Sequence, residues 1–221
     1  REIDPATGED TLLKAATVLG GYDARAYAER SIWVRARDGE SIPVSLVYKK
    51  GAPLESMPMF ITGYGAYEIS TDPAFSVARV SMLDRGVLYA VPHVRGGGEM
   101  GRAWYETGRR LNKKHTFEDF VDATAALQDC GLADPARTVA NGGSAGGLLM
   151  GAVANLAPER YAGIEADVPF VDALTTMLDP SLPLTVTEWD EWGDPLHDVE
   201  AYQYMRGYSP YENSPMPADD G

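Results

Sequence analysis

The chain has 221 residues, which is enough for one sizeable core and a fragment of a second unit. Its formal net charge is −14 and no basic stripe could neutralise phosphates, so nucleic-acid binding is excluded and cationic ligands are favoured. Cys130 is the single cysteine, so no internal disulfide can form, and we expect a reducing compartment, the cytoplasm. No apolar run reaches transmembrane length, and the opening REIDPATGED does not resemble a signal peptide.

Predicted strands and helices alternate along most of the chain. The stretches SIWVRA and ESIPVSLVY flank the turn dipeptide Asp38-Gly39, a pattern that predicts two antiparallel strands. The alternation that follows is typical of a mostly parallel sheet covered by helices, so the sequence predicts an α/β fold. In chain order the further predicted elements are a strand running into glycine at 57–65, a helix at 72–86, a strand at 87–94, a helix at 116–131, a strand at 138–141, a helix at 148–157 and a strand at 162–168.

Capping residues mark the ends of two predicted helices. Asp72 is predicted to cap the first helix, with Pro73 at its first position and Gly86 just past its end. Thr116 is predicted to cap the second, whose apolar residues recur at helical spacing.

A single serine lies among glycines in VANGGSAGGLLMGAVANLA, where a predicted strand meets a predicted helix. A nucleophilic hydroxyl must project from the backbone so that a base and a substrate carbonyl can both reach it, and a sharp strand-to-helix turn achieves this. The residues two before and two after the serine crowd such a turn and must be small. Here they are Gly142 and Gly146, around Ser144.

The helix after Ser144 would support this chemistry, because its N-terminus points backbone N–H groups at a developing oxyanion. Small residues let that helix lie close to the sheet: Gly147, Gly151 and Ala152. The alternative is a glycine-rich loop that packs a helix against a strand, with Ser144 as a helix cap. The strand before it and the helix after it favour a nucleophile.

A second glycine motif, Gly96-x-Gly98-x-x-Gly101, follows a predicted strand, and Asp119 lies about twenty residues on, as in a dinucleotide-binding loop. The helix that should begin at the third glycine is absent, because RAWYETGRRLNKKH is polar and interrupted by Gly108. Asp119 also falls inside a predicted helix and not at a strand end. We therefore expect no nucleotide cofactor, and no His, Cys or carboxylate cluster has the spacing of metal ligands.

Several ordered motifs between about Tyr22 and Asn213 resemble the catalytic domain of the prolyl oligopeptidase family of serine peptidases. These motifs are GYGAYEISTDPAFS, RGVLYAVPHVRGGGEMGRAWYETGR, NKKHTFEDFVDA, NGGSAGG, PFVDALTTMLDPSLPLT and EWDEWGDP. The run from LTTMLD to EWGDP resembles the branch of the family that cleaves after Arg or Lys.

Such enzymes combine an α/β-hydrolase domain with a β-propeller that restricts access to peptides. The resemblance implies that residues 1–25 are the end of a propeller and its linker. Residues 26–221 would then be a partial α/β-hydrolase catalytic domain, incomplete at its C-terminus. Its partners would be the missing propeller and a C-terminal segment.

The resemblance assigns catalytic roles to three residues. Ser144 matches the nucleophile, and Tyr64 matches the tyrosine whose hydroxyl joins the Ala145 backbone N–H in the oxyanion hole. Taken alone, Tyr64 would be interpreted as an aromatic residue that covers the end of a strand.

Two acidic residues match the primary specificity pocket, Glu188 and Asp190. A guanidinium binds a carboxylate in bidentate geometry, and two carboxylates hold it better than one. The alternative is a solvated acidic loop, which an acidic protein readily supplies. The family position matched to Asp190 more often carries Glu, so this side chain has a shorter reach.

A second subsite for basic residues uses acidic side chains near STDPAFS in this branch. Asp72 matches one of them, whereas Ala74 stands where the other would be. Asp72 is therefore either a substrate-binding residue or only a helix cap, and a preference for dibasic sequences stays open.

Family order puts the triad Asp and His after the segment where this chain stops, at Gly221. The three histidines, His93, His115 and His197, lie in other motifs, and none matches the catalytic histidine. We expect the chain to carry a nucleophile, an oxyanion hole and a specificity pocket without the base, and to be inactive alone.

The combined prediction is a serine oligopeptidase that cleaves short basic peptides after Arg or Lys through an acyl-enzyme on Ser144, with no nucleic-acid, membrane, metal or cofactor partner. The alternatives are another peptidase of the family, such as a prolyl-specific one, an esterase on the same fold, or a non-catalytic module. The acidic pair before EWGDP discriminates among them, because a proline pocket would be apolar.

Overall fold

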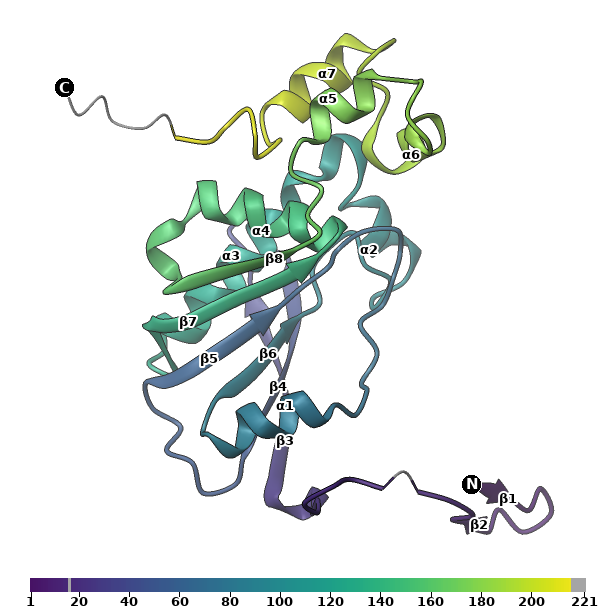
Figure 1. Ribbon diagram of the computed structural model, residues 1–221, viewed down its shortest axis with the longest axis vertical. Helices are drawn as coiled ribbons and strands as arrows, with labels where there is room; N and C mark the ends of the chain where they lie inside the picture. Colours follow the sequence, from purple (N-terminus) through teal and green to yellow (C-terminus); the bar gives the residue numbers. More distant parts are fainter. Residues whose placement is uncertain (16, 216–221) are drawn as a thin grey trace.

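The centre of the molecule is a six-stranded sheet in the order β3-β4-β6-β5-β7-β8, seen in a computed structural model that describes residues 1–15 and 17–215. The predicted antiparallel pair leads the sheet, since β3 pairs with β4 and β4 with β6 in that sense, while the other neighbours are parallel (Figure 1). The α/β class is therefore confirmed. The strands are β3 (Tyr27–Arg35), β4 (Ser41–Lys49), β5 (Met57–Thr62), β6 (Leu88–Pro92), β7 (Ala133–Gly143) and β8 (Gly163–Asp167).

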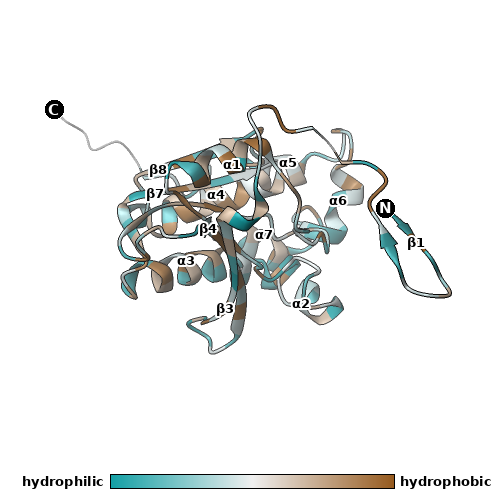
Figure 2. Ribbon diagram, turned by 90° about the horizontal axis from the view of Figure 1, so that it is seen from below, coloured by the Kyte–Doolittle hydropathy of each residue, from teal (hydrophilic) through white to brown (hydrophobic). Residues whose placement is uncertain are grey.

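Helices cover both faces of this sheet. α3 (Lys114–Asp129) and α4 (Ala145–Leu156) contact each other and β7, whereas α1 (Val77–Asp84) contacts β4 and β6. On the α1 face, Phe60 stacks on Tyr89, and the Arg79 guanidinium lies over the Tyr89 ring. Figure 2 shows α1 and α3 on opposite sides of the strands. The core includes Met59, Ile61, Leu88, Phe117, Phe120, Leu148 and Leu149, all buried.

The first predicted helix begins four residues later than its sequence pattern suggests. Ser76 is the N-cap of α1, and its hydroxyl accepts a hydrogen bond from the Arg79 N–H at 3.3 Å. The interpretation of Asp72 as the cap is therefore wrong. The Arg79 guanidinium donates to the Ala74 carbonyl, and Phe75 packs edge-on against a tyrosine of the N-terminal segment, so this stretch stays outside the helix.

The second predicted helix begins earlier, at Lys114, with Lys113 as its N-cap. Thr116 lies inside α3 and not at its cap, because its buried hydroxyl donates to the carbonyls of Arg95 and Gly108. The predicted end of α1 is confirmed, since Gly86 follows it with a φ of 82°.

Two groups of short elements lie at opposite ends of the molecule (Figure 1). A small hairpin of β1 (Glu2–Ile3) and β2 (Asp10–Thr11) stands clear of the sheet (Figure 1), and its assignment to the end of a propeller stays a prediction. α5, α6 and α7 gather at the opposite end. None of the described helices is long and apolar enough to cross a membrane. The other helices are α2 (Arg102–Glu106), α5 (Ala173–Leu178), α6 (Thr185–Trp192) and α7 (Val199–Arg206), with 3-10 turns at Ala24–Ala26, Arg110–Asn112 and Pro158–Arg160.

Candidate active site

Ser144 lies on a sharp turn between β7 and α4 and is exposed. Its φ of 57° is strained for a residue with a side chain, and such strain persists only where the surroundings enforce it. A Cβ on Gly142 would lie 2.3 Å from the Gly146 carbonyl oxygen, and one on Gly146 would lie 2.6 Å from the Gly63 oxygen. The turn therefore has the elbow geometry that the glycine pattern predicts.

The backbone of Ser144 is fixed by the segment that follows β8. Its N–H donates to the Asp167 carbonyl at 2.9 Å, and its carbonyl accepts from the Phe170 N–H at 3.2 Å. The small residues of α4 serve this segment more than the sheet, because a Cβ on Gly147 would lie 2.5 Å from the Pro169 Cα. Gly151 makes similar room for Pro210.

The Tyr64 phenol and the Ala145 N–H both lie beside Ser144. Tyr64 follows the end of β5 and is half-buried, and its Cδ2 would be 3.4 Å from a Cβ on Gly146. Burial raises the pKa of Tyr64, while a side-chain hydrogen bond with Ser144 acts to lower that pKa. As the first residue of α4, Ala145 has a backbone N–H without an intrahelical partner. Two donors therefore converge near the serine hydroxyl.

A pocket of about 390 Å³ opens beside Ser144 and has aromatic walls. The Trp192 ring lies edge-on to Tyr67 with centroids 5.6 Å apart, and its centroid is 5.5 Å from that of Phe170. Glu188 is the charged residue of the lining. The remaining lining residues are Ala145, Val168, Pro169, Thr176, Met177, Pro183, Leu184 and Thr185.

Glu188 is held in this pocket by two donors on one carboxylate oxygen. Its Oε2 accepts hydrogen bonds from the Tyr67 hydroxyl and from the Trp192 Nε1–H, the latter at 3.0 Å. Burial, and then the bond to Glu188, raise the pKa of Tyr67 well above its ordinary value, so Tyr67 remains a donor. The carboxylate thus has a fixed orientation.

Asp190 does not join Glu188 in the pocket. Its side chain is 72% exposed, forms an ion pair with Arg109 at 3.2 Å and a second one with Arg110, and lines a separate hollow on α6. Asp72 is likewise exposed, on the loop before α1, and is not among the residues that line the pocket beside Ser144. Of the acidic residues matched to specificity subsites, the structure brings only Glu188 to the serine.

Two buried charged residues that contact the loop of the site tyrosines were not predicted from the sequence. Glu191 accepts hydrogen bonds from the Tyr67 N–H at 3.1 Å and from the Tyr105 hydroxyl at 2.6 Å. Lys113 donates from Nζ to the Gly65 carbonyl. Glu191 could have been found, because it lies three residues after Glu188 on one helix face. Lys113 gave no such signal, because it belongs to the polar stretch NKKH.

No histidine of the described residues is hydrogen-bonded to Ser144. Each has other partners: His93 bonds to Ser45 and Glu99, His115 to the Thr107 carbonyl and His197 to Asp194. Over the same residues, no group of three or more His, Cys, Asp or Glu side chains could hold a metal ion.

The second glycine motif has a packing role. A Cβ on Gly96 would lie 2.2 Å from the Gly65 carbonyl oxygen, and Asp119 is buried in an ion pair with Arg95. The helix that follows Gly101 has only five residues. The motif thus lacks the helix and the free acidic residue of a dinucleotide site.

Known proteins resemble this chain over nearly its whole length. Dipeptidyl aminopeptidase BI from Pseudoxanthomonas mexicana is 53% identical over 96% of this chain and 29% of its own length. Protease 2 from Moraxella lacunata is 47% identical over 94% of this chain and 30% of its own length. The structure of oligopeptidase B from Leishmania major gives a TM-score of 0.91 at 44% identity, covering 96% of this chain and 29% of that one.

The chain therefore spans about three-tenths of the length of these relatives. Its architecture is that of their α/β-hydrolase catalytic domain. Residues 73–218 match the profile of the prolyl oligopeptidase family. The chain belongs to the prolyl oligopeptidase family of peptidases.

Proposed function

We propose that this sequence is the nucleophile-bearing part of a longer serine oligopeptidase that cleaves short peptides after Arg or Lys. The observation that carries the proposal is Glu188, an oriented carboxylate inside an aromatic pocket that opens beside Ser144. A prolyl pocket has no need of a carboxylate, because the proline ring carries no charge.

The proposed chemistry is acyl transfer. Ser144 Oγ attacks the scissile carbonyl carbon, and the carbonyl oxygen takes up negative charge as the tetrahedral intermediate forms. The Tyr64 hydroxyl and the Ala145 N–H donate hydrogen bonds to that oxygen. Collapse expels the amine and leaves an acyl-enzyme, which water hydrolyses. We propose that the histidine base comes from sequence outside this chain, since the three histidines here are bonded elsewhere.

A substrate side chain in the pocket would meet two kinds of surface. The aliphatic stem of Arg or Lys would pack against Trp192 and Phe170, and the cation would face Glu188. Within the described part of the chain, both donors to Glu188 use Oε2, which leaves Oε1 for the cation. A guanidinium would gain more than an ammonium, because it is planar and can stack on an aromatic wall of the pocket while it donates to Oε1.

A second candidate activity is release of dipeptides from a free amino terminus. The relative from Pseudoxanthomonas mexicana is named a dipeptidyl aminopeptidase, and it shares 53% of aligned residues with this chain. Both activities would use the same serine and the same pocket. They differ in whether the substrate needs a free α-amino group two residues before the cleaved bond.

The test uses the full-length protein that carries this sequence. A small fluorophosphonate should label Ser144, and Ser144→Ala should abolish the labelling. Hydrolysis of N-acylated peptide amides should rank arginyl above lysyl, and lysyl well above prolyl and leucyl. A prolyl or leucyl preference would refute the basic specificity. Cleavage only of dipeptide substrates with a free amino terminus would establish the second candidate.

A further inference from the structure

The loop at 64–68 carries both site tyrosines in an unusual backbone conformation. Gly65, Tyr67 and Glu68 have φ values of 70°, 59° and 59°, so two side-chain-bearing residues in succession are left-handed. Such a conformation costs free energy and persists only where contacts enforce it. Tyr64 begins this loop beside Ser144, and Tyr67 forms a wall of the pocket. The contacts that hold this loop therefore determine the positions of Tyr64 in the oxyanion hole and of Tyr67 in the pocket wall.

Two buried charged side chains supply those contacts. Lys113, 1% exposed, donates to the Gly65 carbonyl, and Glu191, 3% exposed, accepts from the Tyr67 N–H. They come from different elements, since Lys113 precedes α3 and Glu191 lies near the end of α6. The loop is thus held at one carbonyl and one N–H by partners distant in sequence.

The same two side chains also connect loop 64–68 to α6 and α2. The Lys113 Nζ lies 5.1 Å from the centroid of the Trp192 ring. The second oxygen of Glu191 accepts from the Tyr105 hydroxyl, which in turn accepts from Arg109 at 3.0 Å. Loop 64–68 and α6 are therefore connected through one buried polar network.

Charged groups are a costly means of holding a loop. Burying a charged group costs desolvation free energy that apolar residues of the same volume avoid. Burial lowers the pKa of Lys113 to about 8, against the attraction of Glu191, which acts in the opposite direction. Lys113 and Glu191 therefore hold the loop at a cost in folding stability that neutral residues would avoid.

We propose that Lys113 and Glu191 form a clamp that positions loop 64–68 against α6. Lys113 fixes the peptide between Gly65 and Ala66, one residue after Tyr64, and so the position of the oxyanion donor, while Glu191 sets Tyr67 and through it the orientation of Glu188. Neither side chain lines the pocket, so both are positioning residues. The inference rests on the proposed function, because it assigns the clamp to acyl transfer and to selection of basic side chains.

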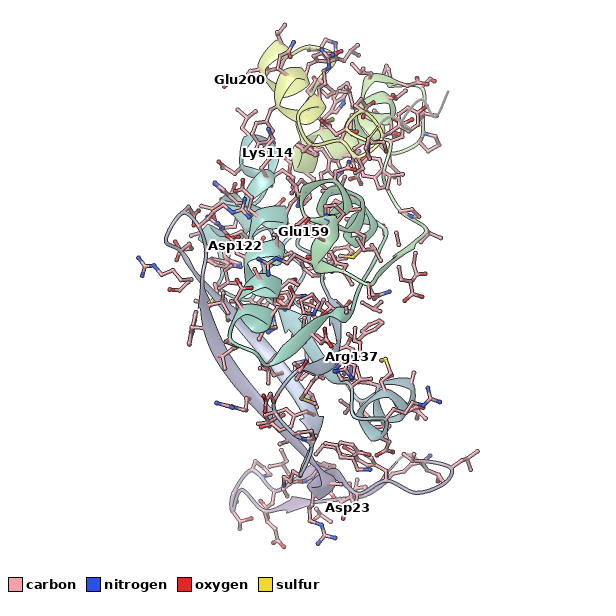
Figure 3. The ribbon with its side chains drawn as sticks, turned by 90° about the vertical axis from the view of Figure 1, so that its left-hand side faces the viewer. Asp23, Lys114, Asp122, Arg137, Glu159 and Glu200 are labelled. Carbon is pink, nitrogen blue, oxygen red and sulfur yellow. The ribbon has the colours of Figure 1, made fainter. Side chains whose placement is uncertain are left out.

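The experiment compares Lys113→Met, Glu191→Gln and the double variant in the full-length protein. Two kinetic readouts are used: the rate at which a small uncharged fluorophosphonate labels Ser144, and kcat and KM for arginyl and leucyl peptide amides. The unfolding midpoint is recorded for each variant. Asp122→Asn is the matched control, because Asp122 also accepts a backbone N–H bond, from Arg37 at 2.7 Å. Asp122 lies on α3 toward the β3–β4 hairpin (Figure 3), and it is not among the residues that line the pocket.

The two arms of the clamp should fail differently. Lys113→Met should slow labelling and lower kcat on both substrates about tenfold, with the arginyl-to-leucyl ratio little changed. Glu191→Gln should lower that ratio about tenfold, chiefly through KM for the arginyl substrate, with a smaller effect on labelling. Because the residues hold one loop, the double variant should lose less than the product of the two single losses.

The clamp is refuted if both variants shift only the unfolding midpoint, as Asp122→Asn is expected to do, and keep every kinetic value within twofold. If Glu191→Gln does not accumulate, Tyr105→Phe removes one partner of Glu191 and should lower the arginyl-to-leucyl ratio about threefold, and an unchanged ratio refutes that arm. If the parent protein shows no preference for the arginyl substrate, the proposed substrate is refuted but the clamp is not. The labelling rate of Lys113→Met then still shows whether Lys113 holds the loop.

Discussion

Glu188 and Asp190 lie two residues apart on α6, yet Glu188 lines the pocket beside Ser144, whereas Asp190 forms an ion pair with Arg110 in the lining of a different hollow. Two positions on a helix are separated by about 200°, so their side chains point to nearly opposite sides. In this structure α6 therefore does not direct the two carboxylates toward the same cation. Its pocket face carries Glu188 and, one turn on, the buried Glu191.

This arrangement predicts unequal effects for the two acidic residues. In the full-length protein, Glu188→Gln should lower the arginyl-to-leucyl ratio of kcat/KM at least thirtyfold, since truncating one side of a buried charge pair costs about 2–5 kcal/mol. Asp190→Asn should change the ratio at most a few-fold, because its exposed carboxylate is already paired with Arg109 and Arg110. Equal losses in both variants would show that Asp190 turns toward a bound substrate.

Removal of the Tyr64 hydroxyl should slow acylation without weakening binding. Tyr64→Phe loses one of two oxyanion donors, which costs roughly 3 kcal/mol, or a hundredfold or more in kcat, with KM nearly constant. Tyr161→Phe is the matched control, because it removes the hydroxyl of a half-buried tyrosine that is bonded to Thr124 and does not line the pocket. Single-turnover rates for the two variants and the parent give the comparison. A normal acylation rate in Tyr64→Phe would leave Tyr64 a packing residue.

Local patterns predicted the parts of the fold whose causes are local. Gly142 helped to predict the elbow, because the steric conflict that it avoids, with the Gly146 oxygen, arises within five residues of sequence. Period-two and helical spacing found the strands and the main helices. The cap of α1 was misplaced because Ser76, four residues after Asp72, is an equally good cap, and distant contacts decided between them.

The rest of the site could not be predicted, because its contacts join residues far apart in sequence. The bond between Glu191 and Tyr67 spans 124 positions, and that between Lys113 and Gly65 spans 48. Nothing local separates Lys113 from its polar neighbours in NKKH. The outward direction of Asp190 depends on where α6 begins, and its start at Thr185 follows a left-handed Leu184 that no capping residue announces.

The chain of 221 residues, expressed alone, should have negligible peptidase activity. Ser144 has no histidine partner among the described residues, and a serine hydroxyl without a base is a poor nucleophile near neutral pH. The oxyanion donors would leave weak residual turnover. Release of a fluorogenic arginyl amide measures this. Robust hydrolysis that disappears in Ser144→Ala would show that the chain itself holds a base.

The elbow should tolerate a methyl group at one glycine and not at its neighbour. Gly142→Ala places a Cβ 2.3 Å from the Gly146 oxygen, so the turn must shift, and a misplacement near 1 Å costs on the order of a hundredfold in labelling of Ser144. In Gly143→Ala the nearest atoms, those of Asp167, are 3.5 Å away, and labelling should stay within a few-fold of the parent. Similar labelling rates in both variants would contradict the crowded turn.

Lys113 should give the stability of the protein a measurable pH dependence. Burial lowers its pKa from 10.5 to about 8, so between these values the unfolded chain binds more protons than the folded one. The contribution of Lys113 to the free energy of unfolding therefore rises with pH through this window, by at most about 3 kcal/mol, and its cost is fully present below pH 8. Urea unfolding at pH 7 and pH 10, followed by tryptophan fluorescence, compares the parent with Lys113→Met. The free energy of unfolding of the parent should increase relative to that of Lys113→Met between pH 7 and pH 10.

Lys50→Met is the control for loss of a lysine, because Lys50 is exposed. A difference that is flat or falls with pH would mean that Lys113 is solvated, and the buried charge on which the clamp depends would not exist.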